Sequence, residues 1–234
     1  MSHEIVSEIK GEMRGIGNPC RRKRVKSYFR ETIKTHGLTS AQEKELAKKY
    51  YTRVKGELQT TIEVVDELIE SGVLDEAQVG IRLLRRMANR LTPNHFEILD
   101  GWVGHLTNWA NTDSLGTWII SEVLDKDPNL VESLLGWTSS ESRWRRRAAA
   151  VSLVPIARKG EMLEEIFRVA DRLMTDEDDM VQKGVGWLLK EASKNHPNEI
   201  RSYLLRWREE ASALILRYAS EKLPSEMRVL KTKH

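Results

Sequence analysis

The sequence predicts an all-α protein built as one solenoid of stacked helix pairs. Apolar residues recur at three- and four-residue steps through nearly the whole chain, as on one face of a helix. Alternating patterns bounded by hairpin turns, which would indicate strands, are absent. Two segments that begin at Pro128 and Pro197 resemble each other and lie 69 residues apart. That distance is twice a unit of about 35 residues, a length typical of helix-pair repeats.

The N-terminal region differs from the rest of the chain. A partly amphipathic stretch over residues 1–16 ends at a break rich in glycine, with Asn18 and Pro19, and the basic run Arg21–Arg24 follows. Residues 39–43 are typical of a helix start, with serine or threonine as the cap and an acid close behind. We expect residues 1–50 to form a helical cap on the solenoid, within one domain that spans residues 1–234.

Residues 51–223 are expected to form the repeats, and residues 224–234 a basic C-terminal tail. Helical stripes occupy, in order, Val64–Leu74, Val79–Leu91, Asp113–Lys126, Leu130–Trp137, Ala148–Ile156, Met162–Leu173, Val181–Ala192 and Ile200–Trp207. Short polar or proline-containing breaks separate them, and a proline after a capping residue is a helix-start signal. A generic helical bundle with chance similarity is the alternative. Small residues at corresponding places favour the solenoid, because Ala and Gly let inner helices pack closely.

Composition narrows the classes of function. The net charge is only +3, so attraction to a polyanion must come from clustering of cations. Cys20 is the single cysteine, which excludes an internal disulfide and fits a reducing compartment. Histidines with metal-ligand spacing, a glycine-rich phosphate loop and a nucleophile elbow are all missing. Without an apolar span or a secretion signal, we expect a soluble cytoplasmic protein, associated with the nucleoid, that uses no metal and no cofactor and binds no membrane.

Basic clusters predict a surface for phosphate groups. Arg147, Lys183 and Arg217 fall at one repeated position if the inner helix of each pair contributes one of them. They would then form a stripe along the concave face, suited to a phosphate backbone. Solvated helix faces are the alternative, and for Arg21–Arg24 both interpretations stay open.

The seven tryptophans divide into two groups. Three lie in apolar stripes and are expected in the core: Trp118, Trp137 and Trp207. Trp109 is different, because it comes at the end of a helix in a polar stretch. Trp187 follows Lys183 by four residues and is expected on the same helix face, beside the basic stripe. An exposed indole next to cations can stack on a base or face a cationic group.

Asp113 has two interpretations. It precedes Ser114 and Leu115, where it could cap a helix or interact with the helix dipole. Alternatively, a carboxylate that faces a deoxyribose could stabilise an oxocarbenium-like transition state, as carboxylates do in glycoside hydrolysis. The sequence pattern is the same for both.

Three segments resemble the AlkD-type HEAT-like-repeat alkylpurine DNA glycosylases: Trp109–Ser114, Arg143–Ala149 and Lys183–Glu191. The similarity extends from about Tyr28 to Leu223. The resemblance implies a right-handed α-α superhelical solenoid with a concave basic groove. It also implies that Asp113, Trp109 and Trp187 line the cleft around the sugar of the damaged nucleotide, and that Arg147 contacts the backbone. We expect further DNA contacts from Arg143, Arg146, Lys183, Lys190 and Tyr28.

The implied reaction is hydrolysis of the N-glycosidic bond of cationic N3- or N7-alkylated purines in duplex DNA, without base flipping, by a monofunctional enzyme that acts as a monomer. Lys190 and Ala110 depart from the family pattern, at positions where an arginine and a polar or acidic residue are common. Two alternatives stay open. One is a relative that binds branched or damaged DNA without catalysis, and the other is a protein-interaction scaffold.

Overall fold

The computed structural model describes residues 2–55 and 57–231, and every regular element among them is helical apart from one isolated bridge between Lys34 and Val73. The predicted all-α fold is therefore confirmed. The chain divides into two compact units, residues 1–122 and 123–234, and each is described by itself. Among the described residues, no helix is long and apolar enough to cross a membrane.

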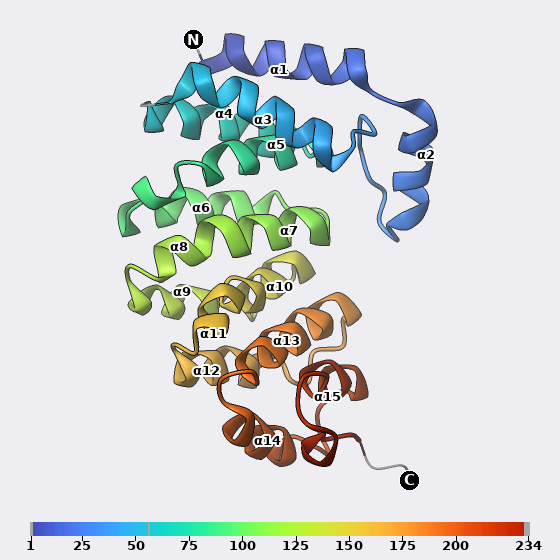
Figure 1. Cartoon of the computed structure of the whole chain (residues 1–234), viewed down its shortest axis with the longest axis vertical. Coiled ribbons are helices and arrows are strands. Elements are labelled where there is room, and N and C mark those ends of the chain that lie inside the picture. The colour runs from blue at the N-terminus through green and yellow to red at the C-terminus, as the bar shows by residue number, and fades with distance from the viewer. Residues whose placement is uncertain (1, 56, 232–234) are drawn as a thin grey trace. The chain divides into compact units, whose positions relative to one another are not determined.

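The described residues of the first unit form seven complete α-helices (Figure 1). They are α1 (Ser2–Ile16), α2 (Pro19–Tyr28), α3 (Ser40–Val54), α4 (Leu58–Glu70), α5 (Leu74–Arg85), α6 (Phe96–Gly104) and α7 (Trp109–Leu115), with short 3₁₀ turns at Ala88–Arg90 and Pro93–His95. Helices α1, α3, α4 and α5 pack against one another. Their shared core includes Ile9, Tyr50, Leu68 and Val79, so the N-terminal helices are part of the packed unit.

Helix α3 begins where the sequence predicts. The Thr39 hydroxyl accepts a hydrogen bond from the Gln42 backbone N–H, and the Gln42 side chain accepts one from the Thr39 backbone in return. This capping box satisfies two backbone donors that the first helical turn leaves unpaired. The helix that contains Asp75 starts without such a cap at Leu74.

The predicted helix over Asp113–Lys126 is wrong in its start. Asn108 is the cap of α7, since its side chain accepts from the Asn111 backbone N–H at 2.9 Å. Trp109 therefore opens a helix and does not end one, and Asp113 lies inside the helix, so it is not a cap. A π-helical segment, Gly116–Ile120, and α8 (Ser121–Leu124) continue the chain. Asn108 and Asn111, which belong to the polar stretch around Trp109, are thus buried at the start of α7.

The second unit repeats a helical hairpin. Its helices are α9 (Val131–Trp137), α10 (Arg143–Val151), α11 (Val154–Lys159), α12 (Leu163–Leu173), α13 (Asp179–Ala192), α14 (Pro197–Arg206) and α15 (Ala213–Ala219), with 3₁₀ turns at Pro128–Leu130 and Ser225–Met227. Helices α10, α13 and α15 pack side by side, and α12 packs against both α9 and α13. The similar segments at Pro128 and Pro197 are thus two hairpins apart, with the α12–α13 hairpin between them, as the 69-residue spacing predicts.

Glycine permits the close approach of these inner helices. A Cβ on Gly186 would lie 2.5 Å from Cβ of Tyr218, and one on Gly184 would lie 3.3 Å from Cγ of Arg147. Because real Cβ atoms do not come within 3.0 Å of another side chain, Gly186 fixes the distance between α13 and α15. Gly184 and Gly186, two of the small residues from which the sequence predicts a solenoid, thus let neighbouring helices pack closely.

The predicted burial of three tryptophans is confirmed only for Trp137, which is 3% exposed. Trp118 and Trp207 are half-buried. The Trp207 indole N–H donates to a carboxylate oxygen of Asp171 at 3.0 Å, and Trp118 lies beneath two arginines. An indole is large and carries a polar N–H, so one edge often stays at the surface.

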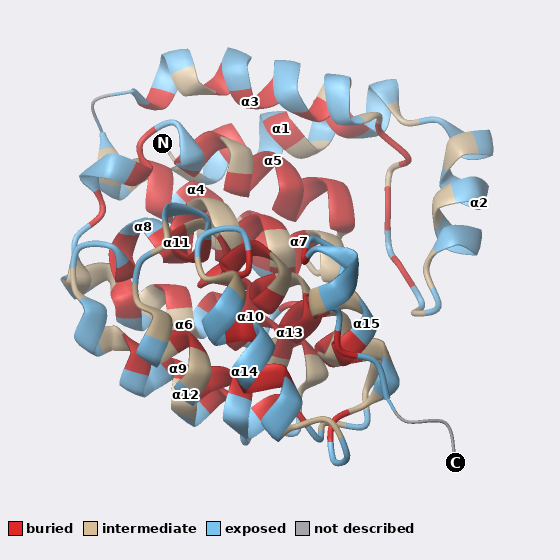
Figure 2. Cartoon of the chain, turned by 60° about the horizontal axis from the view of Figure 1, so that its bottom comes forward, coloured by how far each residue is buried: buried red, intermediate tan, exposed pale blue. Residues whose placement is uncertain are grey.

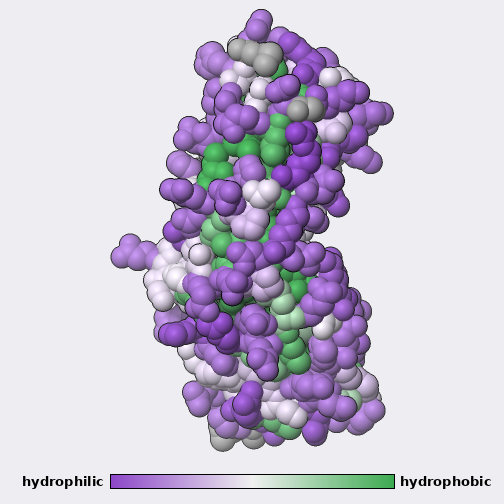
Figure 3. Space-filling model, turned by 90° about the vertical axis from the view of Figure 1, so that its left-hand side faces the viewer, coloured by the Kyte–Doolittle hydropathy of each residue, from purple (hydrophilic) through white to green (hydrophobic). Residues whose placement is uncertain are grey.

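Burial follows the helix faces that the periodicity predicts, except in α2 (Figure 2). That helix contains no buried residue. On the face drawn in Figure 3, hydrophilic side chains cover most of the surface and apolar ones form narrow patches between them. Only four large apolar side chains among the described residues are classed as exposed, and Tyr28 is the most open, at 71%.

Candidate active site

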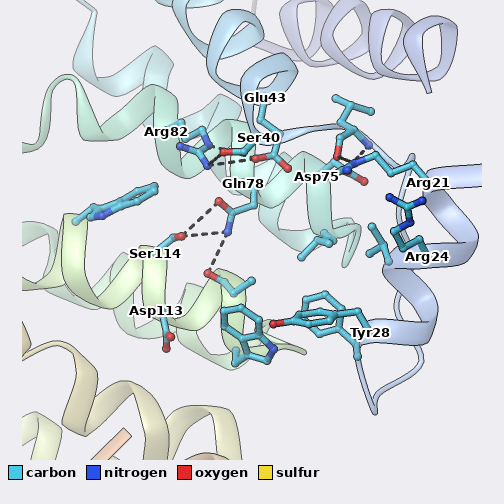
Figure 4. A pocket seen from close by; sticks show the side chains of 17 residues that line it. Arg21, Arg24, Tyr28, Ser40, Glu43, Asp75, Gln78, Arg82, Asp113 and Ser114 are labelled. Atoms are coloured by element: carbon cyan, nitrogen blue, oxygen red, sulfur yellow. Dashed lines mark hydrogen bonds and ion pairs between the residues drawn. The ribbon is translucent and has the colours of Figure 1, made fainter. Parts of the chain in front are cut away.

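A pocket of about 580 Å³ lies in the first unit, with walls from α2, α3, α5, α7 and the segment between α2 and α3. It brings together three of the predicted site residues: Tyr28, Trp109 and Asp113. Figure 4 shows Asp113 and Ser114 on opposite sides of α7. Asp113 is half-buried, as is Trp109. The pocket therefore combines a carboxylate, aromatic faces and, from α2 and α5, guanidinium groups.

Helix α7 is held in place by Gln78 of α5. The amide nitrogen of this buried side chain donates to the Ala110 carbonyl at 3.0 Å, to the Asn111 side-chain oxygen at 2.9 Å and to the Ser114 hydroxyl at 3.1 Å. An amide nitrogen has two hydrogens, so three acceptors share two donors. These acceptors lie on the turns of α7 that carry Trp109 and Asp113. Gln78 therefore sets the position of the two predicted catalytic side chains relative to α5.

The aromatic wall of the pocket joins α2 to α7. The Phe29 and Trp109 rings are stacked, with centroids 5.5 Å apart and planes at 24°, and Tyr28 meets Trp109 edge-on at 6.2 Å. Such pairs add roughly 0.5–1.5 kcal/mol each beyond the area they bury. The Trp109 indole is therefore fixed at the pocket wall, with one side in contact with α2.

The segment between α2 and α3 is pinned by Asp75, in the first turn of α5. Its carboxylate accepts from the Thr35 hydroxyl and the His36 backbone N–H, both at 2.6 Å, and from the Leu38 N–H at 3.0 Å. Gly37 has φ +79°, and a Cβ there would lie 2.6 Å from the Asn18 carbonyl oxygen. The segment thus passes directly against the start of α2 and fixes one side of the pocket.

Glu43 is a third carboxylate in the pocket wall, beside Asp113 and Asp75, although its sequence pattern indicates only a place at a helix start. It is 7% exposed and lies 3.3 Å from the Arg82 guanidinium, which also donates to the Ser40 hydroxyl at 2.9 Å. Burial raises the pKa of Glu43 to about 7, even though Arg82 lowers it; Asp75 adds a smaller upward contribution. Glu43 is therefore partly protonated near neutral pH. Only the tertiary fold buries it, so no local signal marked it.

Trp118 is a further pocket residue that the sequence assigned to the core. The guanidinium carbons of Arg85 and Arg82 lie 4.3 and 5.1 Å from its ring centroid. Cations at this distance are attracted to the face of an indole. Trp118 thus gathers two arginines at the edge of the pocket, where they add positive charge beside the aromatic wall.

In the second unit, two of the predicted DNA-binding arginines hold the chain itself. The Arg146 guanidinium meets both carboxylate oxygens of Asp176, at 2.6 and 3.3 Å, and donates to the carbonyls of Ser140 and Glu141. Arg143 lies 3.2 Å from Asp178 and over the Trp144 ring. Arg146 is thus a staple between the start of α10 and the loop before α13.

Arg147 is buried, at 6% exposure, and donates to the Met180 carbonyl. Arg147, Lys183 and Arg217 of the predicted stripe lie on α10, α13 and α15, and these helices pack in that order. Its members differ in exposure, however. Lys183 is half-buried and paired with Asp179 one turn earlier at 2.8 Å, and Arg217 is exposed over the Tyr218 ring.

Trp187 and Lys190 lie on α13. Trp187 is half-buried, and the Arg158 guanidinium carbon lies 5.7 Å from its ring centroid. Arg158 in turn lies 3.0 Å from the buried Glu191, whose pKa is lowered: burial would raise it, but hydrogen bonds from Lys194 and Arg158 more than offset this. Lys190 lies 3.4 Å from Glu221. A basic neighbour of Trp187 is thus Arg158, a residue that no sequence pattern indicated.

The described part of the chain contains no group of three histidine, cysteine or acidic side chains that could hold a metal ion. What the first-unit pocket offers is a half-buried carboxylate, an indole face and arginines. Together these suit a ligand that carries both positive charge and phosphate.

Comparisons with known proteins give one matching family model and similar solved structures. The sequence model of the DNA alkylation repair enzyme family matches residues 9–223. A structure described as "Predicted DNA alkylation repair enzyme from Enterococcus faecalis" superposes with a TM-score of 0.76 at 18% identity, over 89% of this chain and 97% of that one. AlkD2 from Streptococcus mutans superposes with a TM-score of 0.65 at 18% identity, over 96% of this chain and 100% of that one. No curated protein matches in sequence.

Proposed function

Because the chain belongs to the DNA alkylation repair enzyme family, and so to a family of DNA repair, we propose that it is a monofunctional DNA glycosylase. Its substrates are purines that alkylation at N3 or N7 has made cationic, within duplex DNA. The observation that carries the proposal is the pocket in which Asp113 and Trp109 share one wall with Tyr28. The protein acts as a monomer without a metal.

The leaving group explains why so few catalytic groups are needed. An alkylated purine already carries a positive charge, so it departs as a neutral base when the bond from C1′ breaks and takes the bonding electron pair. A general acid would add little. Positive charge instead develops on the sugar, and only interactions that strengthen in that transition state raise the rate. Water then adds to C1′ and loses a proton to solvent, which leaves an abasic site.

Asp113 and the tryptophans address that charge. A half-buried carboxylate stabilises a nearby cation more strongly than one in bulk water, because the local dielectric constant is lower. The faces of Trp109 and Trp187 add cation–π attraction. We assign Asp113 and Trp109, which share the first-unit pocket, to the sugar. From the family resemblance we propose Trp187 as a further sugar contact, and Arg147, Arg143, Lys183 and Lys190 as backbone contacts. The base has no need to leave the helix, since the groups act on the sugar.

The absence of a nucleophilic amine supports a monofunctional enzyme. Strand cleavage by a bifunctional glycosylase proceeds through a covalent adduct with an amine. Among the described residues that line the pocket there is no lysine. The expected product is therefore an abasic site in an unbroken strand.

The proposal is tested with a duplex that contains a single 7-methylguanine. Wild-type protein should release free 7-methylguanine at low salt, and the strand should break only after treatment with hot alkali. No release would contradict the glycosylase assignment, and binding to branched DNA in its absence would favour the non-catalytic alternative. Strand breaks without alkali would contradict the monofunctional mechanism.

A further inference from the structure

Trp187 shares one face of α13 with a buried carboxylate. Trp187 and Glu191 are four residues apart, so their side chains lie one turn apart on the same side of the helix. Trp187 is half-buried, whereas Glu191 is only 5% exposed. One of the two is an indole assigned above to the sugar, and the other is an acid that the proposed mechanism does not use. A single cation from another helix joins them.

Arg158, in the last turn of α11, contacts both side chains at once. Its Nε donates to Oε2 of Glu191 at 3.0 Å, and its guanidinium carbon lies 5.7 Å from the centroid of the Trp187 ring. A cation within about 6 Å of the face of an indole is attracted to it. A guanidinium held at one edge by a carboxylate also keeps its plane free to stack on a ring. The pair with Glu191 therefore orients Arg158 toward Trp187.

The backbone of Arg158 is held in place as well. Asn195, which follows α13, donates from its side-chain amide to the carbonyls of Ala157 and Arg158, both at 3.2 Å. The His196 ring donates to the Gly160 carbonyl at 2.8 Å. These bonds satisfy carbonyls that the end of a helix leaves unpaired. The end of α11 is thereby fixed to the end of α13, so the Arg158 side chain extends from a rigid base.

Glu191 neutralises the cation that lies over the indole. Burial alone would raise the pKa of Glu191, but hydrogen bonds from Lys194 and Arg158 lower it, so the carboxylate is ionised at neutral pH. An unpaired cation on one face of Trp187 would repel the positive charge that develops on a sugar at the other face. The carboxylate reduces this repulsion. Arg158 can therefore hold the ring and still leave its opposite face to a cationic centre.

We propose that Arg158 is a positioning residue for Trp187: held by Glu191, it fixes the indole so that the face turned away from the guanidinium meets the sugar. The effect on the reaction rests on the proposed function, whereas the placement of the ring by Arg158 is a property of the free protein. Arg158 itself contacts no substrate. Its loss frees the indole to rotate, and a misplaced group at the reacting centre slows the reaction even where binding is kept.

The first test observes the indole without DNA. The seven tryptophans are replaced by 5-fluorotryptophan, and the fluorine resonance of Trp187 is identified by its absence in W187F. In R158Q this resonance should shift more than that of any other tryptophan. R168Q is the matched control, because Arg168 also lies in an ion pair, 2.7 Å from Glu132, and its side chain is 48% exposed against 49% for Arg158. R168Q should leave the Trp187 resonance in place. An unchanged resonance in R158Q would overturn the inference.

The second test is single-turnover release of 7-methylguanine from the duplex described above. R158Q should slow release about tenfold at unchanged duplex affinity, and R168Q should react like wild type. In the W187F background R158Q should cause no further loss, because two residues that act through one contact are not additive. The same loss in both backgrounds would overturn the inference, since the effect would not pass through Trp187. A shifted resonance with no release by wild type would retain the placement of Trp187 by Arg158 and reject only the glycosylase.

Discussion

The side-chain amide nitrogen of Gln78 lies 3.1 Å from the hydroxyl oxygen of Ser114, the residue next to Asp113. The same nitrogen reaches the Ala110 carbonyl, one residue after Trp109. A single buried side chain of α5 thus meets α7 beside Trp109 and Asp113, two of the three residues proposed to contact the sugar. Loss of the Gln78 side chain should therefore act mainly on the placement of Trp109 and Asp113.

Gln78→Ala should therefore slow base release about tenfold, which corresponds to about 1.4 kcal/mol in the barrier, with little change in affinity for the duplex. The measurement is single-turnover release at saturating protein, together with a binding titration. Gln182→Ala is the matched control, since its amide also donates to one backbone carbonyl, that of Asp176 at 2.7 Å, but in the second unit. Equal losses in both variants, or a loss confined to affinity, would contradict a positioning role.

Glu43 should make the protein less stable as pH rises. The folded state keeps the proton of Glu43 up to a pKa of about 7, whereas the ordinary value is 4.5. Between these values the folded state binds more protons, so the free energy of unfolding falls with rising pH. The effect is fully absent below the lower value and complete above the higher one. The full change in the free energy of unfolding is about 3 kcal/mol.

Urea unfolding of wild type and Glu43→Gln at pH 5 and pH 8 measures this effect. The glutamine variant should gain stability relative to wild type on going from pH 5 to pH 8. Glu45→Gln, an exposed neighbour on α3, should show no such change. A difference between wild type and Glu43→Gln that is the same at both pH values would show that Glu43 does not titrate in this range.

Arg146 should stabilise the folded state, and this stabilisation should require its planar guanidinium. Arg146→Lys loses the two-oxygen contact with Asp176 and the donors to two carbonyls, which should cost about 2 kcal/mol. Arg172→Lys, at an exposed site on α12, should change the free energy of unfolding by less than about 0.5 kcal/mol. If Arg146→Lys is as stable as wild type and Arg146→Gln lowers the slope of log K against log salt for duplex binding by about 0.9, Arg146 faces phosphate instead.

Much of the fold could be predicted from sequence because its signals are local. The helix-pair repeat, the proline-led helices at Pro128 and Pro197, and the cap at Thr39 each depend on residues a few positions apart. The start of α7 was missed because Asn108 and Asp113 are both good capping residues, and only the backbone hydrogen bonds distinguish them. Helix boundaries depend on such details more than helix existence does.

The site was less predictable because its burial is set by residues distant in sequence. Asp75, Gln78 and Glu43 look like ordinary polar residues on helices, and each is buried by contacts made from about 30 to 40 positions away. Trp118 lies in an apolar stripe, yet arginines of another helix keep its face at the pocket. The spacing of Trp109 and Asp113 did not predict that they share a pocket, and only the family resemblance indicated it.

The most direct test of the central claim is single-turnover release of 7-methylguanine by wild type and Asp113→Asn. Asparagine keeps the size of the side chain and removes its charge, so helix α7 should be preserved. Removal of one such electrostatic group costs about 100-fold or more in rate, while Asp127→Asn, at a cap in the second unit, should react like wild type. We predict a loss of about that size at unchanged duplex affinity. Release by Asp113→Asn at the wild-type rate would contradict it.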